Sequence, residues 1–128
     1  MAEKGFTPVS VHPLFTAQAL AAGQSATSRV IDLRYVAQRG KFAMATSLAG
    51  GTSTTCGTTG LTYLVGIALD STFAAPTGTS ATIGTYGSGN TWAEFNPVLT
   101  PFIQIVATQT GAGGAGAQTK VTAALIAQ

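Results

Sequence analysis

Few side chains in this sequence have the types and spacing that chemistry requires. Its carboxylates, imidazole and thiol are Glu3, Asp32, Asp70, Glu94, His12 and Cys56. Charged residues make up 8 % of the 128 residues, against roughly a quarter in an ordinary soluble domain. Most enzymes place a carboxylate, histidine, lysine or cysteine of shifted pKa beside a second titratable group. Such pairs are so scarce here that we expect no catalytic residues and no enzyme activity.

Metal and thiol chemistry have equally little support. His12 lies between Val11 and Pro13, and no second histidine exists to share a metal ion. Zinc sites take three or four protein ligands at recognisable spacing, so we expect no metal. Cys56 stands among serines and threonines without an evident base, which favours an inert thiol or one that meets a copy of itself. A serine nucleophile would also need a base, and His12 is the sole imidazole.

The spacing of residues 111–116, GAGGAG, matches a dinucleotide-binding motif. That motif holds a pyrophosphate only where a helix follows at once and an acidic residue lies about twenty positions further on. Residues 119–127 favour a strand instead, and none of residues 117–128 is acidic. We therefore interpret the glycines as a flexible hairpin tip and expect no cofactor.

Aromatic side chains offer one further binding chemistry, the stacking of sugars. Tyr35, Tyr63, Tyr86 and Trp92 are amphipathic rings of the kind that line carbohydrate sites. Trp92 and Tyr86 flank a glycine-rich loop, which makes them the candidate ligand-facing aromatics. The competing interpretation, which we favour, packs Trp92 in the protein core. A carbohydrate-binding β-sandwich module is accordingly an alternative function.

Positive residues cluster weakly between positions 29 and 41. Arg29, Arg34, Arg39 and Lys41 lie there, but Asp32 lies among them and the net charge is only +2. Nucleic-acid surfaces interleave such cations with stacking aromatics, and this segment has no regular interleaving. We expect a solvated turn and strand edge, and no nucleic-acid partner.

Short β-prone segments separated by glycine, serine and threonine follow one another along the chain. The strands predicted from period-two alternation and β-branched content cover 14–20, 27–36, 41–48, 61–69, 81–86, 91–95, 101–110 and 119–127. No amphipathic helix is evident. This pattern predicts an all-β fold, an antiparallel β-sandwich or jelly roll of seven to eight short strands. Segments 61–69 and 101–110 are the most apolar and should be the best protected.

The first thirteen residues differ from the rest. Pro8 and Pro13 fix the backbone and remove ladder donors, so residues 1–13 are predicted to form an extended N-terminal arm and residues 14–128 a single sandwich domain. Three apolar side chains of the arm form a candidate assembly interface: Phe6, Val9 and Val11. An aromatic anchor in a desolvated pocket commonly contributes about 2 kcal/mol or more to an interface, which makes Phe6 the expected anchor.

Charge content and apolar runs lead to three further expectations, on assembly, on membranes and on the place of synthesis. A surface so poor in charge favours a chain that hides much of itself in an assembly, so we expect a homo-oligomer. The longest apolar run, residues 61–69, falls short of the roughly 18 to 20 residues that a bilayer span needs, and we expect no membrane partner. The first residues also lack the apolar stretch of a signal peptide, which predicts synthesis in a cytoplasm.

Two stretches resemble known proteins when they are taken together. Residues 25–34 (SATSRVIDLR) resemble the early strand of small β-rich proteins encoded by tailed bacteriophages and prophages, and residues 95–111 with 121–128 resemble their closing hairpin. The resemblance implies a virion structural protein with a sandwich fold. A capsid decoration or cement protein that binds the major capsid protein as a multimer is the expected role, with a tail, neck or baseplate component as the alternative.

Overall fold

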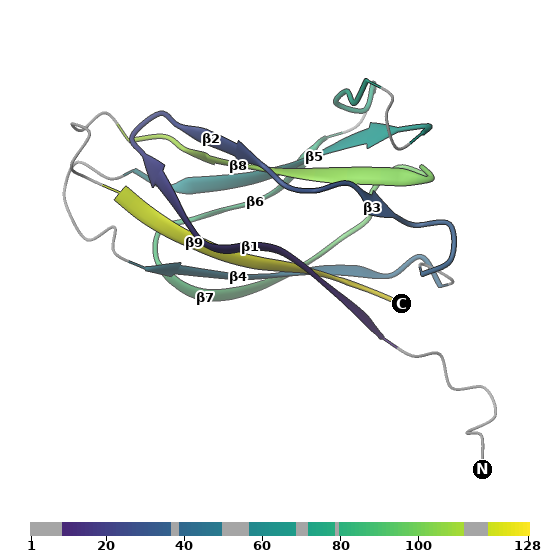
Figure 1. The fold of residues 1–128 in the computed structure, drawn as a ribbon, viewed down its shortest axis with the longest axis horizontal. Helices are drawn as coiled ribbons and strands as arrows, with labels where there is room; N and C mark the ends of the chain where they lie inside the picture. The colour runs from purple at the N-terminus through teal and green to yellow at the C-terminus, as the bar shows by residue number, and fades with distance from the viewer. Residues whose placement is uncertain (1–8, 37–38, 50–56, 69–71, 79, 112–117) are drawn as a thin grey trace, which may run out of the picture.

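The chain forms two antiparallel sheets that pack face to face (Figure 1). The computed structural model describes residues 9–36, 39–49, 57–68, 72–78, 80–111 and 118–128. Within those ranges the regular elements are nine β-strands and no helix. The predicted all-β sandwich is therefore confirmed.

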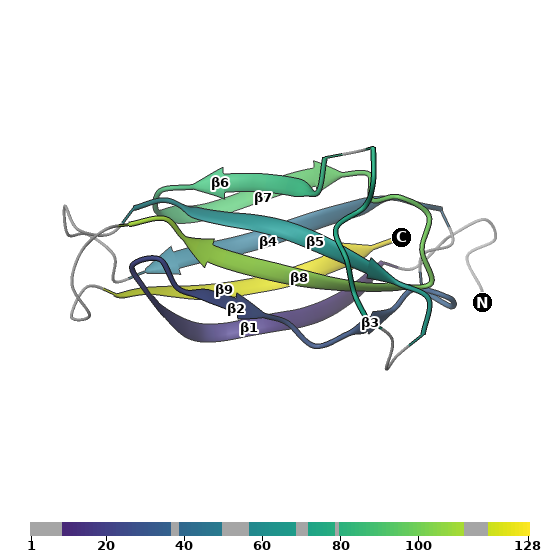
Figure 2. The same ribbon diagram turned by 90° about the horizontal axis from the view of Figure 1, so that it is seen from above.

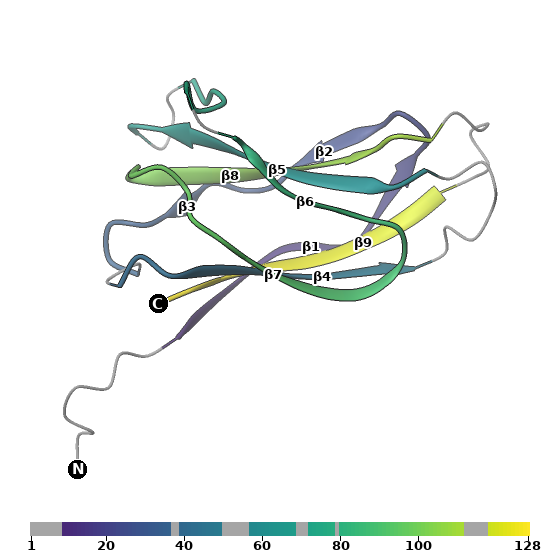
Figure 3. The ribbon, with the colours of Figure 1, turned by 180° about the vertical axis from the view of Figure 1, so that it is seen from behind.

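Each sheet draws strands from both halves of the chain. Sheet A has the order β1 (Ser10–Ala21), β9 (Gln118–Ala127), β4 (Phe42–Ala49) and β7 (Gly89–Phe95). Sheet B has the order β2 (Ser25–Thr27), β8 (Phe102–Gln109), β5 (Thr59–Gly66) and β6 (Thr82–Tyr86), with β3 (Ile31–Asp32) also on β8. Figure 2 shows sheet B in front of sheet A, with β6 and β7 along one side and β1 and β2 along the other, and Figure 3 shows the chain passing from β6 of one sheet to β7 of the other.

The strand β2 and the strand β3 are two pieces of one edge strand. Both pair with β8, and between them Ser28 donates its N–H to the Ile105 carbonyl at 2.8 Å and accepts the Ile105 N–H on Oγ at 3.0 Å. The single strand predicted over 27–36 is wrong in its extent, because pairing ends at Asp32 and a turn follows at 34–36.

When β2 and β3 are counted as one strand, the eight strands pair as a nested hairpin. The first pairs with the last, β2 and β3 with β8, β4 with β7, and β5 with β6. Folding such a hairpin over on itself gives the two interlocked sheets of a jelly roll. The jelly roll named as one of two expected sandwich types is the connectivity that the pairing produces.

Alternation along the strands builds the core between the sheets. The side chains of β8 and β9 that face inward are fully or almost fully buried: Ile103, Ile105, Ala107, Val121, Ala123 and Leu125. Leu61 and Tyr63 of β5 and Met44 of β4 complete the contact between the sheets. The strand predicted over 61–69 ends earlier, at Gly66, and alternates between buried and half-buried residues, whereas Ile67 beyond it is 85 % exposed.

Edge strand β1 begins earlier than the arm prediction allows. Residues 10–13, which the prolines assign to the arm, pair with residues 124–127 of β9. Pro13 is tolerated there because an edge strand needs no ladder donor on its free side. Residues 1–8 of the arm, with Phe6, lie outside the described residues.

The middle of β1 departs from regular pairing. The register shifts between Pro13 and Phe15 and again between Phe15 and Gln18. Between them Ala17 has a φ of 47°, and its N–H donates to Thr122 Oγ1 at 3.0 Å. Bulges of this kind twist an edge and discourage a further strand from pairing with it.

Candidate functional site

Asp32 and Arg34 form a structural ion pair at the end of β3. Arg34 Nε lies 3.0 Å from Asp32 Oδ1, and its Nη2 lies 2.8 Å from Oδ2. These hydrogen bonds lower the pKa of Asp32. The Arg34 guanidinium also lies 5.0 Å from the ring centroid of Phe102. Asp32 Oδ1 also accepts the Arg34 backbone N–H at 3.0 Å, so this local pair holds the turn after β3.

His12 faces the interior beside the open edge of the sandwich. It pairs with buried Leu125, and its Nε2 is buried without a hydrogen-bond partner. Burial, and secondarily the positive charge of Arg29, lower the pKa of His12. Arg29 is held in place by a 3.2 Å hydrogen bond from its Nε to the Pro13 carbonyl. The imidazole is therefore held neutral at neutral pH, in a packing role.

Acidification should destabilise the fold through His12. In the unfolded chain its pKa is about 6.5, whereas the folded pKa is lower. The unfolded state then binds the proton first, so the stability present above pH 6.5 is lost as pH falls through the folded pKa. Thermal melts at about pH 7.5 and pH 5 should show a larger loss for the native chain than for His12→Gln. Equal losses for the two chains would refute this role of His12.

Metal and cofactor chemistry have no assembled site in the described part of the chain. There, no three histidine, cysteine, aspartate or glutamate side chains gather. Cys56, Asp70 and residues 112–117 of the glycine-rich segment lie outside the described residues. After that segment comes β9, a strand as predicted, rather than the helix whose N-terminus a pyrophosphate needs. Among the described residues no helix could span a membrane.

The candidate aromatics do not share one face. Tyr63 is buried in the core, and its hydroxyl accepts the Val98 N–H at 3.3 Å. Tyr86 packs against the core with its hydroxyl buried, and burial raises its pKa. Trp92 is 72 % exposed on β7, so the favoured interpretation that it packs in the core is wrong. Of the two candidate ligand-facing residues, Trp92 alone faces outward.

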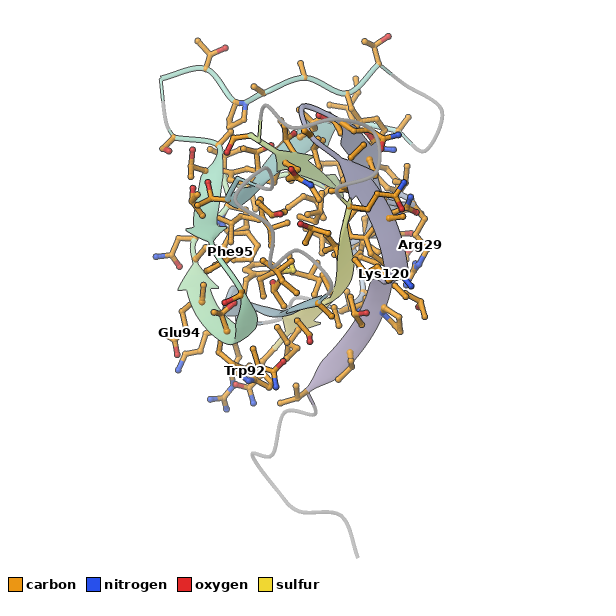
Figure 4. All side chains as sticks on the ribbon, turned by 90° about the vertical axis from the view of Figure 1, so that its left-hand side faces the viewer. Arg29, Trp92, Glu94, Phe95 and Lys120 are labelled. Carbon is orange, nitrogen blue, oxygen red and sulfur yellow. The ribbon has the colours of Figure 1, made fainter. Side chains whose placement is uncertain are left out.

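The outward side of sheet A carries small and apolar side chains in neighbouring register rows. We define the outer face of sheet A by four register rows, which are Val11–Ile126–Ala43–Glu94, Pro13–Ala124–Ala45–Trp92, Thr122–Ser47–Asn90 and Ala19–Lys120–Ala49. Shallow grooves run along the first two rows, and Val9 lines one of them. Figure 4 shows Trp92 and Glu94 on the outside of the sandwich along β7, and Lys120 on the side of β1.

Two of the three predicted assembly residues fall on this surface. Val9 is 56 % exposed and Val11 is 61 % exposed, and Val11 lies opposite Ile126. The alanines beside them were not singled out in the sequence. The alternation of small residues in β4, with Met44 facing inward and Ala43 and Ala45 outward, is the signal that marks them.

Sheet B presents a different surface to solvent. Six of its outward residues bear hydroxyls: Ser25, Thr27, Thr62, Thr82, Thr85 and Thr108. Leu64, Gln104 and Val106 lie on the same side, on the central strands β5 and β8. Ser25 Oγ and Thr108 Oγ1 are 2.7 Å apart and hydrogen-bonded across the strands. Such a face is well hydrated, because exposed hydroxyls bond water as readily as each other. The two outer faces therefore differ, and the apolar one belongs to sheet A.

Comparison with known proteins adds no relative. Protein-family models, curated proteins and solved structures gave no match to this chain.

Proposed function

We propose that this chain is a structural protein of a bacteriophage virion, most directly a capsid decoration protein that binds the major capsid protein as a homo-oligomer. It is made in the host cytoplasm and resides in the virion. The observation that carries the proposal is a charge-poor jelly roll with one apolar outer face. Jelly rolls occur in viral capsid proteins, lectins and cupins. Because a fold alone does not set a function, the choice of a virion role rests on the resemblance of residues 25–34, 95–111 and 121–128 to small β-rich proteins of tailed bacteriophages and prophages.

Repetition on a lattice suits such a surface. A small apolar contact is weak by itself, but many linked contacts raise the overall affinity without any new interaction. A lattice contact of this kind needs no cofactor and no group of tuned pKa. A tail, neck or baseplate component would use the same surfaces and differs only in location.

Removal of the first residues tests the docking role of the arm. Deleting residues 2–8 leaves β1 whole, since β1 starts at Ser10, and should leave the circular dichroism spectrum and melting temperature unchanged. Loss of the Phe6 anchor, worth about 2 kcal/mol, should weaken binding to purified particles at least tenfold. Phe6→Ala should reproduce most of the loss. Particle binding by the truncated chain as tight as that of the full chain would show that the arm does not dock.

A carbohydrate-binding module is the second candidate, favoured by exposed Trp92 on a shallow groove. Stacking on Trp92 would make glycan binding depend on that ring. Saturable glycan-array binding that Trp92→Ala abolishes would support this function. The inward position of Tyr86 leaves Trp92 without the second aromatic that the sequence predicted beside it.

A further inference from the structure

We propose that the outer face of sheet A joins two copies of this chain about a two-fold axis. The inference rests on the proposed function in one respect, since that function requires copies of the chain to associate. It adds the surface, the symmetry and the residues that make the contact.

The face combines one large side chain with a floor of small ones. Trp92 stands at the β7 edge, and Ala45 and Ala124 lie beside it in the same register row. Ser47 and Thr122 pair in the row on the other side of Ala45 from Ala43, and they continue the floor there. Small residues allow close approach of a second surface, and tryptophan is among the side chains that dominate interface energies. The shapes are therefore complementary between copies, with Trp92 of one on the floor of the other.

Glu94 and Lys120 on this face are placed for reciprocal pairing between copies, and Lys41 lines the same groove as Glu94. Glu94 lies opposite Ala43, and Lys120 lies opposite Ala49, so the two charges are separated along β4 by about 20 Å at the rise of a β-strand. The ion pair found among the described residues is Asp32–Arg34, which leaves Glu94 and Lys120 without a charged partner there.

Consider a two-fold axis that lies in the plane of the face and crosses the line from Glu94 to Lys120 at its midpoint, at right angles. Rotation about this axis exchanges the positions of the two charges. Each copy's Glu94 then meets the other copy's Lys120, so one acid and one base form two ion pairs. Self-complementary contacts of this kind are the rule in two-fold dimers. The same rotation carries Trp92 from β7 onto the Ser47–Ala49 part of the second copy's floor, where small side chains leave room for it.

The size of the face sets the expected affinity. Four strands spaced about 4.8 Å apart and about eight residues long cover roughly 500 Å² per copy. Two copies would bury roughly 1,000 Å², near the lower limit for a specific interface. We therefore expect a weak dimer that forms in the micromolar range or above.

The other surfaces of the sandwich are less suited to self-association. Sheet B presents hydroxyl side chains around the outward residues Leu64 and Val106, which are only half-buried. Edge-to-edge pairing through β1 is opposed by Pro13 and by the bulge at Ala17. Tyr35, Ile67 and Leu99 are also exposed apolar side chains, but they stand in turns and loops between strands. Face-to-face contact through sheet A instead buries exposed apolar side chains that lie on paired strands, Val11 and Trp92.

Sedimentation equilibrium of the full chain, from about 10 µM to about 1 mM, tests this interface. The native chain should show a monomer–dimer equilibrium, and Trp92→Thr should raise the dissociation constant at least tenfold. Glu94→Lys should weaken the dimer by placing two lysines together, and the double variant Glu94→Lys/Lys120→Glu should restore it. Ile67→Thr, at another exposed apolar position, is the control and should change nothing.

Each contrary outcome is specific. A native chain that stays monomeric throughout, or a double variant that associates no better than Glu94→Lys, would overturn the proposed interface. A chain present in particles with no dimer in solution would refute this interface and leave the virion role standing. A dimer with these variant effects, from a chain absent from particles, would refute the virion role alone.

Discussion

Leu125→Ala should lower the free energy of unfolding by about 2–5 kcal/mol, the range for leucine truncation in a packed core. Leu125 has no exposed surface and lies on β9 in the centre of sheet A, between His12 of β1 and Met44 of β4. Truncation removes apolar contacts and leaves a cavity that strands fixed on both sides cannot close. Urea denaturation followed by tryptophan fluorescence or circular dichroism measures the change.

The neighbouring residue provides a matched control. Ile126 is next along β9, faces outward and is only half-buried. Ile126→Ala should therefore cost much less than Leu125→Ala when both are measured below the concentration at which copies associate. A reversed order of the two losses would mean that β9 is paired one residue out of register, since a one-residue slip exchanges the two faces of a strand.

Gln109→Leu should destabilise the protein by about 1–3 kcal/mol, although it keeps side-chain volume and adds apolar surface. Gln109 is fully buried near the end of β8, and its Nε2 donates to the Leu20 carbonyl at 2.6 Å and to Thr119 Oγ1 at 3.3 Å. Both acceptors belong to sheet A, so this amide links the two sheets. Leucine would leave those acceptors buried and unpaired. It would also remove the buried Gln109 Oε1, which has no hydrogen-bond partner, but this relief concerns one atom, whereas two acceptors lose their donor.

Thr108→Val is the comparison for this polar link. Thr108 precedes Gln109 on β8 but faces outward, where it shares a hydrogen bond with Ser25. Its replacement removes a solvent-accessible bond, and the expected change is within about 0.5 kcal/mol. Equal unfolding free energies for Gln109→Leu and the native chain would show that the amide contributes no net stability to the contact between the sheets.

Strand positions were largely predictable because alternation is local. Phe42, Met44 and Thr46 share the inward face of β4 as their spacing predicts. The apolar segment 101–110 becomes buried β8 for the same reason. In each case side chains two residues apart must face the same way on a pleated strand, and that constraint needs no knowledge of the partner strand.

Trp92 shows where a local signal was present but outweighed. Its size favoured the core, yet its period-two neighbours Asn90 and Glu94 are polar. Their parity places Trp92 outward, with Thr91 and Ala93 facing in. In this strand the polarity of the residues two positions away is thus a better guide to the orientation of a side chain than its own size.

Pairing across the sheets lay beyond the sequence because it depends on distant partners. Proline at position 13 argues against a strand unless that strand is known to be at an edge, which only its pairing with β9 reveals. The break between β2 and β3 likewise depends on Ser28 bonding to Ile105, far along the chain. The apolar outer face combines residues of β1, β4, β7 and β9, so it exists only once the nested hairpin has folded over.

Electron cryomicroscopy of intact particles, purified from cells that produce this chain, tests the virion role most directly. The account predicts sandwich-shaped density repeated over the capsid exterior, in contact with the major capsid protein and with the outer face of sheet A covered. Density at the tail, neck or baseplate would contradict the decoration role and move the chain to the alternative virion component. Particles that lack the chain, both in density and in protein content, would contradict the virion role itself.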